Sequence, residues 1–220
     1  MPKRFTWLLG IAILVLLALL VACGSEFKPA FDGLLIVPSQ GFALVQTFSF
    51  DLKSGAASEI ASNPPVSSVP NSVVLDPAQQ YAYVISTQSA AVQGSQNLIS
   101  SFKVEPGGTL TPSGTTTLNP IPEENGATTA PAVPKALTID SKGNYLFVAD
   151  IETTDGLGNQ AQGAVSVFSV VGNGTLTEVQ GSPFTLPPTV AGTIPDPVAL
   201  SVSPTIFPAQ SAACSLQPPP

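Results

Sequence analysis

Histidine is absent from this chain of 220 residues, and Arg4 is its only arginine. A Ser-His-Asp triad is therefore excluded, and two cysteines without histidine are too few for a structural zinc site. Charged residues make up only 10% of the sequence, and the net charge is −7. Nucleic acid is excluded as a partner on this balance, because its phosphates are bound by lysine and arginine.

Turn-forming and strand-forming residues are abundant instead. The chain contains 18 Gly and 23 Pro, and hydrophobic residues reach 44%. This apolar content is sufficient for a core in one or two domains. Many Val, Thr, Ser and Phe residues between the turn formers predict an all-β fold of short strands.

Residues 1–22 have the form of a secretory signal. Lys3 and Arg4 precede an unbroken apolar run from Leu8 to Ala22, which predicts an N-terminal signal helix. The run is shorter than the roughly 20 residues that span a bilayer comfortably. An uncleaved transmembrane anchor is the alternative.

The end of this signal, Leu20-Val21-Ala22-Cys23, resembles the bacterial lipobox. The resemblance implies that Cys23 becomes a lipidated N-terminus, so that the protein is exported and bound to the bacterial membrane through a lipid anchor. Ser25 then fits sorting to the outer membrane, on its periplasmic or surface side. A disulfide between Cys23 and Cys214 is the competing interpretation, and it requires an unprocessed signal.

Two segments of the chain repeat each other at a spacing of 64 residues. Val69 to Val84 is matched by Val133 to Val148, a third copy begins at Asp196, and a weaker copy precedes them between Leu34 and Ser58. The predicted strands are 72–75, 81–86, 98–104 and 109–118, then 136–139, 144–149, 164–170 and 175–180. Four antiparallel strands per repeat are typical of a β-propeller blade, and a plain β-sandwich is the alternative.

The repeated motifs carry a family resemblance. Pro-x-x-x-x-x-Asp, Tyr-x-(Tyr/Phe)-Val, Phe-x-Val and Gly-Thr-Leu-Thr resemble the seven-bladed lactonase-type propeller family, which includes bacterial 6-phosphogluconolactonase and fungal muconate cycloisomerase and grades into surface proteins with Tyr-Val-Thr-Asn repeats. The resemblance spans Leu34 to about Pro204. Its muconate enzymes depend on His, Arg and Glu, so no catalytic residue is carried over to this chain.

This organisation predicts a signal in residues 1–22, a linker in 23–33, a partial propeller of about two and a half to three blades in 34–204, and a Pro-rich tail in 205–220. A closed ring needs roughly four to eight blades. An open stack of blades exposes apolar faces, so we expect self-association.

Strand parity predicts that the long connections emerge together. The connections after the second and fourth strands of each repeat are long, and successive antiparallel strands bring them to one face. Binding sites favour loops on a rigid scaffold, although simple surface elaboration is the alternative. Acidic residues gather on or beside these connections, and the candidates for contact with a ligand are Glu123, Glu124, Asp150, Glu152 and Asp155.

An acidic face suits cations, basic peptides or neutral carbohydrate, and it disfavours a sugar phosphate. Asp150 to Gly156 is rich in oxygen ligands, so calcium is weighed as a cofactor, but the spacing departs from an EF-hand and an ordinary solvated loop is the first interpretation. Glu123-Glu124 is weighed in the same way for acid/base work.

The predicted function is a lipid-anchored binding or interaction module of the cell envelope without a cofactor, whose ligand is a protein or a neutral carbohydrate. The alternatives are a sugar-lactone hydrolase and a truncated propeller without independent activity.

Overall fold

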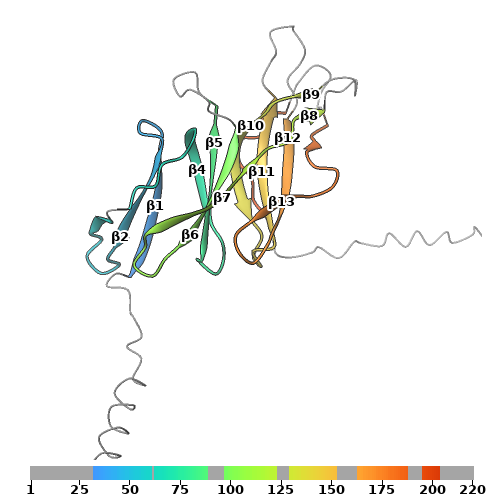
Figure 1. The fold of residues 1–220 in the computed structure, drawn as a ribbon. Helices are drawn as coiled ribbons and strands as arrows, with labels where there is room; N and C mark the ends of the chain where they lie inside the picture. The colour runs from blue at the N-terminus through green and yellow to red at the C-terminus, as the bar shows by residue number, and fades with distance from the viewer. Residues whose placement is uncertain are drawn as a thin grey trace, which may run out of the picture.

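The computed structural model describes residues 32–60, 62–88, 97–122, 129–152, 163–187 and 195–203. Within these ranges the chain is all-β, as predicted, and its strands form three antiparallel sheets and one short hairpin (Figure 1). The described part of the chain has no helix that is long and apolar enough to cross a membrane. The signal helix predicted in residues 1–22 and the lipidation site Cys23 lie outside the described residues.

The three sheets follow one another along the chain, and each has its strands in sequence order. The first sheet contains β1 (Gly33–Ser39), β2 (Leu44–Phe50) and β3 (Ala57–Ile60). The second sheet contains β4 (Val69–Leu75), β5 (Tyr81–Thr87), β6 (Leu98–Val104) and β7 (Leu110–Thr117). The third sheet contains β10 (Ala132–Ile139), β11 (Tyr145–Glu152), β12 (Gly163–Val170) and β13 (Leu176–Glu178), and β14 (Phe184–Thr185) pairs with β12. The hairpin consists of β8 (Ile121–Pro122) and β9 (Thr129–Ala130).

The first strand of each repeat is longer than predicted. The sequence indicated strands from residues 72 and 136, after the repeated prolines, but β4 begins at Val69 and β10 at Ala132. Both prolines lie inside the strands, at a register shift that falls between Pro70 and Ser72 in β4 and between Pro134 and Ala136 in β10. A bulge accommodates proline in a strand because one residue there is released from the ladder.

The repeated aspartates close the turns between the first two strands of each sheet. Asp76 Oδ1 accepts hydrogen bonds from the backbone N–H groups of Gln80 and Tyr81, at 2.7 and 2.8 Å. Asp140 Oδ1 accepts the corresponding bonds from Asn144 and Tyr145, at 2.6 and 2.7 Å. A carboxylate that accepts two backbone N–H groups makes charge-assisted bonds, so this repeated residue has a structural role.

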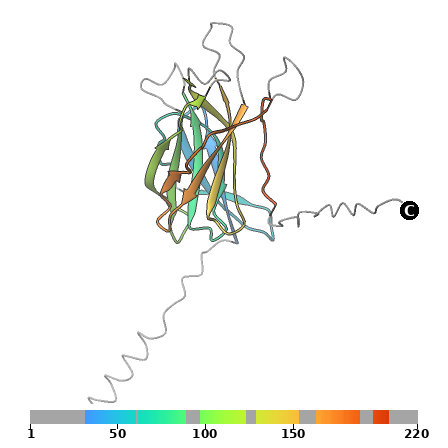
Figure 2. The ribbon, with the colours of Figure 1, turned by 90° about the vertical axis from the view of Figure 1, so that its right-hand side faces the viewer.

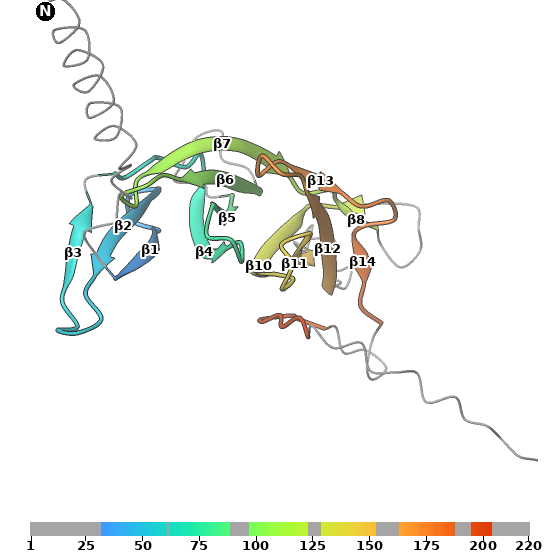
Figure 3. The ribbon, with the colours of Figure 1, turned by 90° about the horizontal axis from the view of Figure 1, so that it is seen from below.

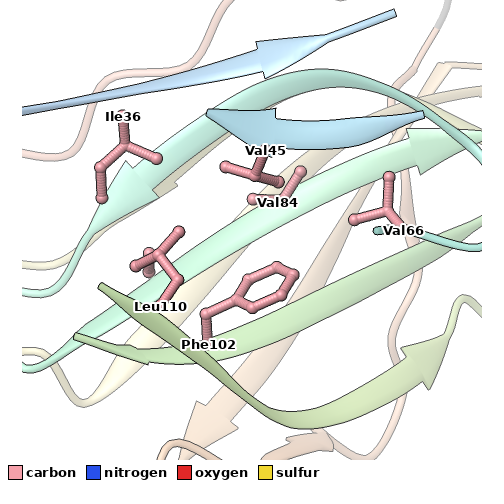
Figure 4. Packing of buried hydrophobic residues seen from close by; sticks show 7 residues of the cluster. Ile36, Val45, Val66, Val84, Phe102 and Leu110 are labelled. Carbon is pink, nitrogen blue, oxygen red and sulfur yellow. The ribbon is translucent and has the colours of Figure 1, made fainter. Parts of the chain in front are cut away.

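The sheets pack face to face in chain order. Figure 3 shows them as a fan, with β4 and β10 on the inner side and β3, β7 and β13 on the outer side, and β4 contacts both β1 and β10. The core between the first and second sheets includes Ile36, Val45, Val66, Val84 and Phe102 (Figure 4). A second core lies between the second and third sheets, and its largest buried members are Tyr83, Ile85, Ile99, Leu146 and Phe168.

The described part of the third copy of the repeat does not form a strand. Residues 195–203 belong to none of the described strands, although Asp196 to Ser203 continues the sequence pattern of β4 and β10. Figure 2 shows this segment, in orange-red, extended alongside the strands of the sheets.

Candidate functional site

The connections that follow the second strands leave from one end of the sheets, which we call the loop face. Val69 pairs with Thr87 at the end of β5, and Ala132 pairs with Glu152 at the end of β11, so both strands end beside the beginning of an inner strand. This end is uppermost in Figure 1. The tight turns closed by Asp76 lie at the opposite end.

Three of the described lysines lie at the end of the sheets opposite the loop face. Lys53 and Lys142 lie in turns at that end, and Lys103 forms an ion pair of 2.9 Å with Glu105 there. Among the described lysines, Lys135 is the exception, because it is exposed on β10 next to the bulge that faces Asp150.

The structure describes only part of the predicted acidic set. Glu123, Glu124 and Asp155 lie outside the described residues. Glu152 is the last residue of β11, at the loop face. Asp150, which we expected on or beside the exposed loops, lies inside β11 and is 0% exposed.

Asp150 is buried because β11 continues to Glu152, three residues further than the predicted strand 144–149. Alternate side chains of a strand point to the same face, so Asp150 shares with Leu146 and Val148 the face of the third sheet that packs against the second. Its Oδ2 accepts a hydrogen bond of 3.2 Å from the backbone N–H of Ser166, in β12. Its Oδ1 is buried and has no hydrogen-bond partner among the described residues.

Glu178 is a second carboxylate on the same face of the third sheet. Its Oε1 accepts a hydrogen bond of 2.8 Å from the Ser182 hydroxyl, and its Oε2 accepts one of 3.3 Å from the backbone N–H of Asn119. Ser182 Oγ in turn accepts from the N–H of Val167, at 2.9 Å. These contacts tie the outer strand β13 to the segment after β7, so they hold the second and third sheets together at their outer side.

Burial raises the pKa of Asp150 to about 7, because the ionised carboxylate is deprived of water. The nearby hydroxyl and N–H of Ser166 oppose this rise, and the negative charge of Glu178 adds to it. A carboxyl group of this kind is divided between its acid and carboxylate forms near neutrality. Such perturbed groups are concentrated at functional sites, and this one lies just beneath the loop face.

A partly buried amide on β4 contacts the strand that pairs with this carboxyl. Asn71 Nδ2 donates a hydrogen bond of 3.1 Å to the carbonyl of Pro134, and Pro134 is the register partner of Asp150. Asn71 Oδ1 and the Ser166 hydroxyl are buried without a hydrogen-bond partner among the described residues. Sequence reasoning missed Asn71, Ser166 and Glu178, since only the strand register and the packing of the sheets bring them near Asp150.

The described residues contain no group of three or more acidic or cysteine side chains that could hold a metal ion. The calcium segment weighed above begins at Asp150 and continues through residues that the structure does not describe.

No protein-family model and no curated protein matches the sequence. Among solved structures, the chain is similar to a Bacteroides fragilis protein proposed to be a 6-phosphogluconolactonase, with a TM-score of 0.51 and 19% identity over 77% of this chain and 39% of that one. It is also similar to the periplasmic gluconolactonase of Pseudomonas aeruginosa, with a TM-score of 0.50 and 21% identity over 76% of this chain and 41% of that one. The chain thus spans about two-fifths of the length of these proteins. At such identities the similarity shows the fold alone, and that fold is lactonase-like.

Proposed function

We propose that this chain is a lipid-anchored binding module of the bacterial cell envelope, built on part of a seven-bladed lactonase-type β-propeller. The observation that carries the proposal is the packing of the second and third sheets. In both, four antiparallel strands follow one another in the same order, and in the third sheet β14 pairs with β12 in addition. The first strands of the two sheets, β4 and β10, contact each other as inner strands of adjacent blades do. The hydrogen bond from Asn71 to Pro134 joins these two strands directly.

The anchor is proposed at Cys23, where the signal and the lipobox-like sequence end. We expect Cys23→Ser to abolish incorporation of a fatty-acid probe and cleavage by the lipoprotein signal peptidase, whereas Cys214→Ser leaves both unchanged. Labelling and processing that persist in Cys23→Ser would refute the anchor without bearing on the sheets.

The ligand is proposed to meet the loop face. In the sequence, the connections that we assign to this face contain Glu123, Glu124 and Asp155, and the chain has no arginine after Arg4. A neutral carbohydrate or a basic protein segment would therefore fit such a face better than a phosphorylated sugar. The test is a panel of neutral glycans and basic peptides, with the melting temperature of the full chain in detergent as the readout. We expect a binder whose effect is reduced in the double variant Glu123→Gln, Glu124→Gln. Glu105→Gln, which removes a carboxylate at the opposite end of the sheets, is the matched control and leaves binding unchanged.

A sugar-lactone hydrolase is the second candidate, and the buried carboxyl of Asp150 favours it. A group with a pKa of about 7 is suited to proton transfer at neutral pH, and both similar structures carry lactonase names. Hydrolysis of gluconolactone above the spontaneous rate, lost in Asp150→Asn, would establish this function in place of the binding role. If the chain shows neither turnover nor binding, the third interpretation, a partial propeller without independent activity, is supported.

A further inference from the structure

Among the described strands, none takes in the first sheet the place of the strand that begins each of the other two. β1 corresponds to β5 of the second sheet. Leu35 of β1 pairs with Phe48 of β2, just as Ala82 of β5 pairs with Phe102 of β6. Each of the two strands also contacts the first strand of the next sheet, β1 contacting β4 and β5 contacting β10. In the second and third sheets the inner edge of this strand is covered by β4 or β10. In the first sheet no described strand pairs with the inner edge of β1.

The chain also carries a copy of that missing strand which no described sheet uses. Asp196-Pro197-Val198-Ala199-Leu200-Ser201-Val202 repeats the pattern Val133-Pro134-Lys135-Ala136-Leu137-Thr138-Ile139 of β10. The segment is extended, and Leu200 and Val202 are partly covered whereas Val198 is 77% exposed.

The spare segment already lies where the inner strand of a further sheet would lie. A Cβ atom built on Gly163 would collide with the Pro195 carbonyl and approach the Pro197 ring to 2.9 Å. Because side chains alternate along a strand, a Cβ on Gly163 would point to the face of the third sheet that is turned away from the second sheet. Residues 195–203 therefore lie along the far side of the third sheet, with the second sheet between them and the first sheet of the same chain (Figure 3).

Two open faces accompany the open edge. The outward face of the first sheet carries Leu35, Val37, Phe48 and Phe50, and Leu35 is 47% exposed. The far face of the third sheet carries Phe147, Val165 and Val167, which are only partly covered. Faces of this composition meet in the two cores inside the chain.

We propose that a second copy of this chain covers both features. The first sheet of one copy docks on the far face of the third sheet of the other, and residues 195–203 of the latter pair with β1 as its missing inner strand. The register is predicted from the pairing of β10 with β11, in which Leu137 lies opposite Val148 and Ile139 opposite Leu146. By correspondence of the repeats, Leu200 of one copy should lie opposite Val37 of the other, and Val202 opposite Leu35. The inference rests on the propeller arrangement proposed above.

The stoichiometry follows from the sheets. With the donated strand, the described residues of each copy form three sheets of at least four strands. Two copies therefore contribute about six sheets, within the range of roughly four to eight at which propeller rings close. Head-to-tail contacts produce closed rings when the rotation per copy is right and filaments when it is not. A closed dimer leaves no inner edge of this kind open.

The test is a disulfide between the two predicted partners. In the full chain in detergent, with Cys23 and Cys214 changed to Ser, the pair Val37→Cys and Leu200→Cys is oxidised and analysed on a non-reducing gel. Antiparallel partners have Cα atoms about 4.5–5.5 Å apart, within the range that a disulfide spans. We expect a dimer band at least tenfold stronger than that of the control pair Val37→Cys and Ser201→Cys, whose second side chain points to the other face.

A monomeric disulfide, a ladder of higher bands, or equal yields from the two pairs would overturn the proposal. As a second measurement, Leu35→Glu is expected to shift the full chain from dimer to monomer in sedimentation. Leu52→Glu, the same substitution at a 71% exposed leucine in a turn, is expected to leave the dimer intact. Dimerisation that is equally sensitive or equally insensitive to both substitutions would contradict the proposed surface.

Failure of the dimer and failure of the propeller arrangement are distinguishable by hydrogen exchange. If the chain is monomeric while the amides of β4 and β10 are protected, only the docking of a second copy is refuted. If those inner strands exchange freely, the arrangement of the sheets itself is refuted.

Discussion

Replacing Asp150 with asparagine should change how the stability of the protein depends on pH. The carboxyl is 0% exposed and its pKa rises from 3.8 to about 7 on folding. Between these two values the folded chain retains a proton that the unfolded chain has released. The contribution of this group to stability should therefore be largest below pH 4, fall as the pH rises, and level off above pH 7.

The size of the effect follows from the shift in pKa. One pKa unit corresponds to about 1.4 kcal/mol, so the change from 3.8 to about 7 predicts a loss on the order of 4 kcal/mol between pH 4 and pH 8. This is a large fraction of the roughly 5–15 kcal/mol by which a domain is stable. Asparagine has almost the same shape and no charge, so Asp150→Asn should remove the slope and be more stable than the unsubstituted protein at pH 8.

Urea unfolding of the full chain in detergent, followed by circular dichroism from pH 4.5 to pH 8, measures this slope. This pH range excludes the contribution of carboxylates with a lowered pKa. The pKa of Asp51, for example, is lowered mainly by the backbone N–H of Ser54, so its contribution to stability is lost only at more acidic pH. Asp196→Asn removes the same charge from an exposed position and should retain the slope. A flat profile for the unsubstituted chain, or equal slopes for it and Asp150→Asn, would refute the reasoning.

Three further outcomes are expected. Gly174→Ala should destabilise the protein by about 3 kcal/mol, because Gly174 has a φ of 78° and a Cβ there would collide with the Tyr81 ring. Gly172→Ala is the control and should cost less than about 1 kcal/mol, because its Cβ meets open space. Equal effects of the two substitutions on urea unfolding would contradict this reasoning. Asp76→Ala and Asp140→Ala should each lower the free energy of unfolding by about 1–3 kcal/mol, since each removes two charge-assisted hydrogen bonds, and similar losses at the two positions are the sign of a repeated role. Turnover of 6-phosphogluconolactone should stay at the spontaneous rate in a coupled assay, and hydrolysis well above that rate would disprove the exclusion of phosphorylated sugars.

The sheets could be predicted from the sequence because their signals are local. Alternating apolar residues between turns predicted eight of the nine strands of the second and third sheets, all but β14, and the spacing between Asp76 and Asp140 predicted their repetition. The beginnings of the first strands are predicted too late from the sequence, because Pro70 and Pro134 are expected to precede the strands. A bulge absorbs Pro70 and Pro134, and a single sequence carries no sign of such a bulge.

The surroundings of Asp150 could not be predicted in the same way. Its burial depends on β11 continuing to Glu152, and its hydrogen bond with Ser166 depends on the register between β11 and β12. Glu178 acts on it from a strand 28 residues further along the chain. Such effects arise from packing between elements, which composition and periodicity do not encode.

The packing of the sheets in chain order has a consequence for how the molecule comes apart. The main contacts between the described sheets join each sheet to its neighbour in chain order, as in a repeat protein whose stability is a sum of internal terms and nearest-neighbour terms. The second sheet has a neighbour on both sides within the chain, whereas the first has one. The free energy needed to open a sheet should therefore decrease from the middle of the array outwards, so that the first sheet opens at a lower free energy than the second. The chain would then behave as a series of coupled units rather than as a single two-state body.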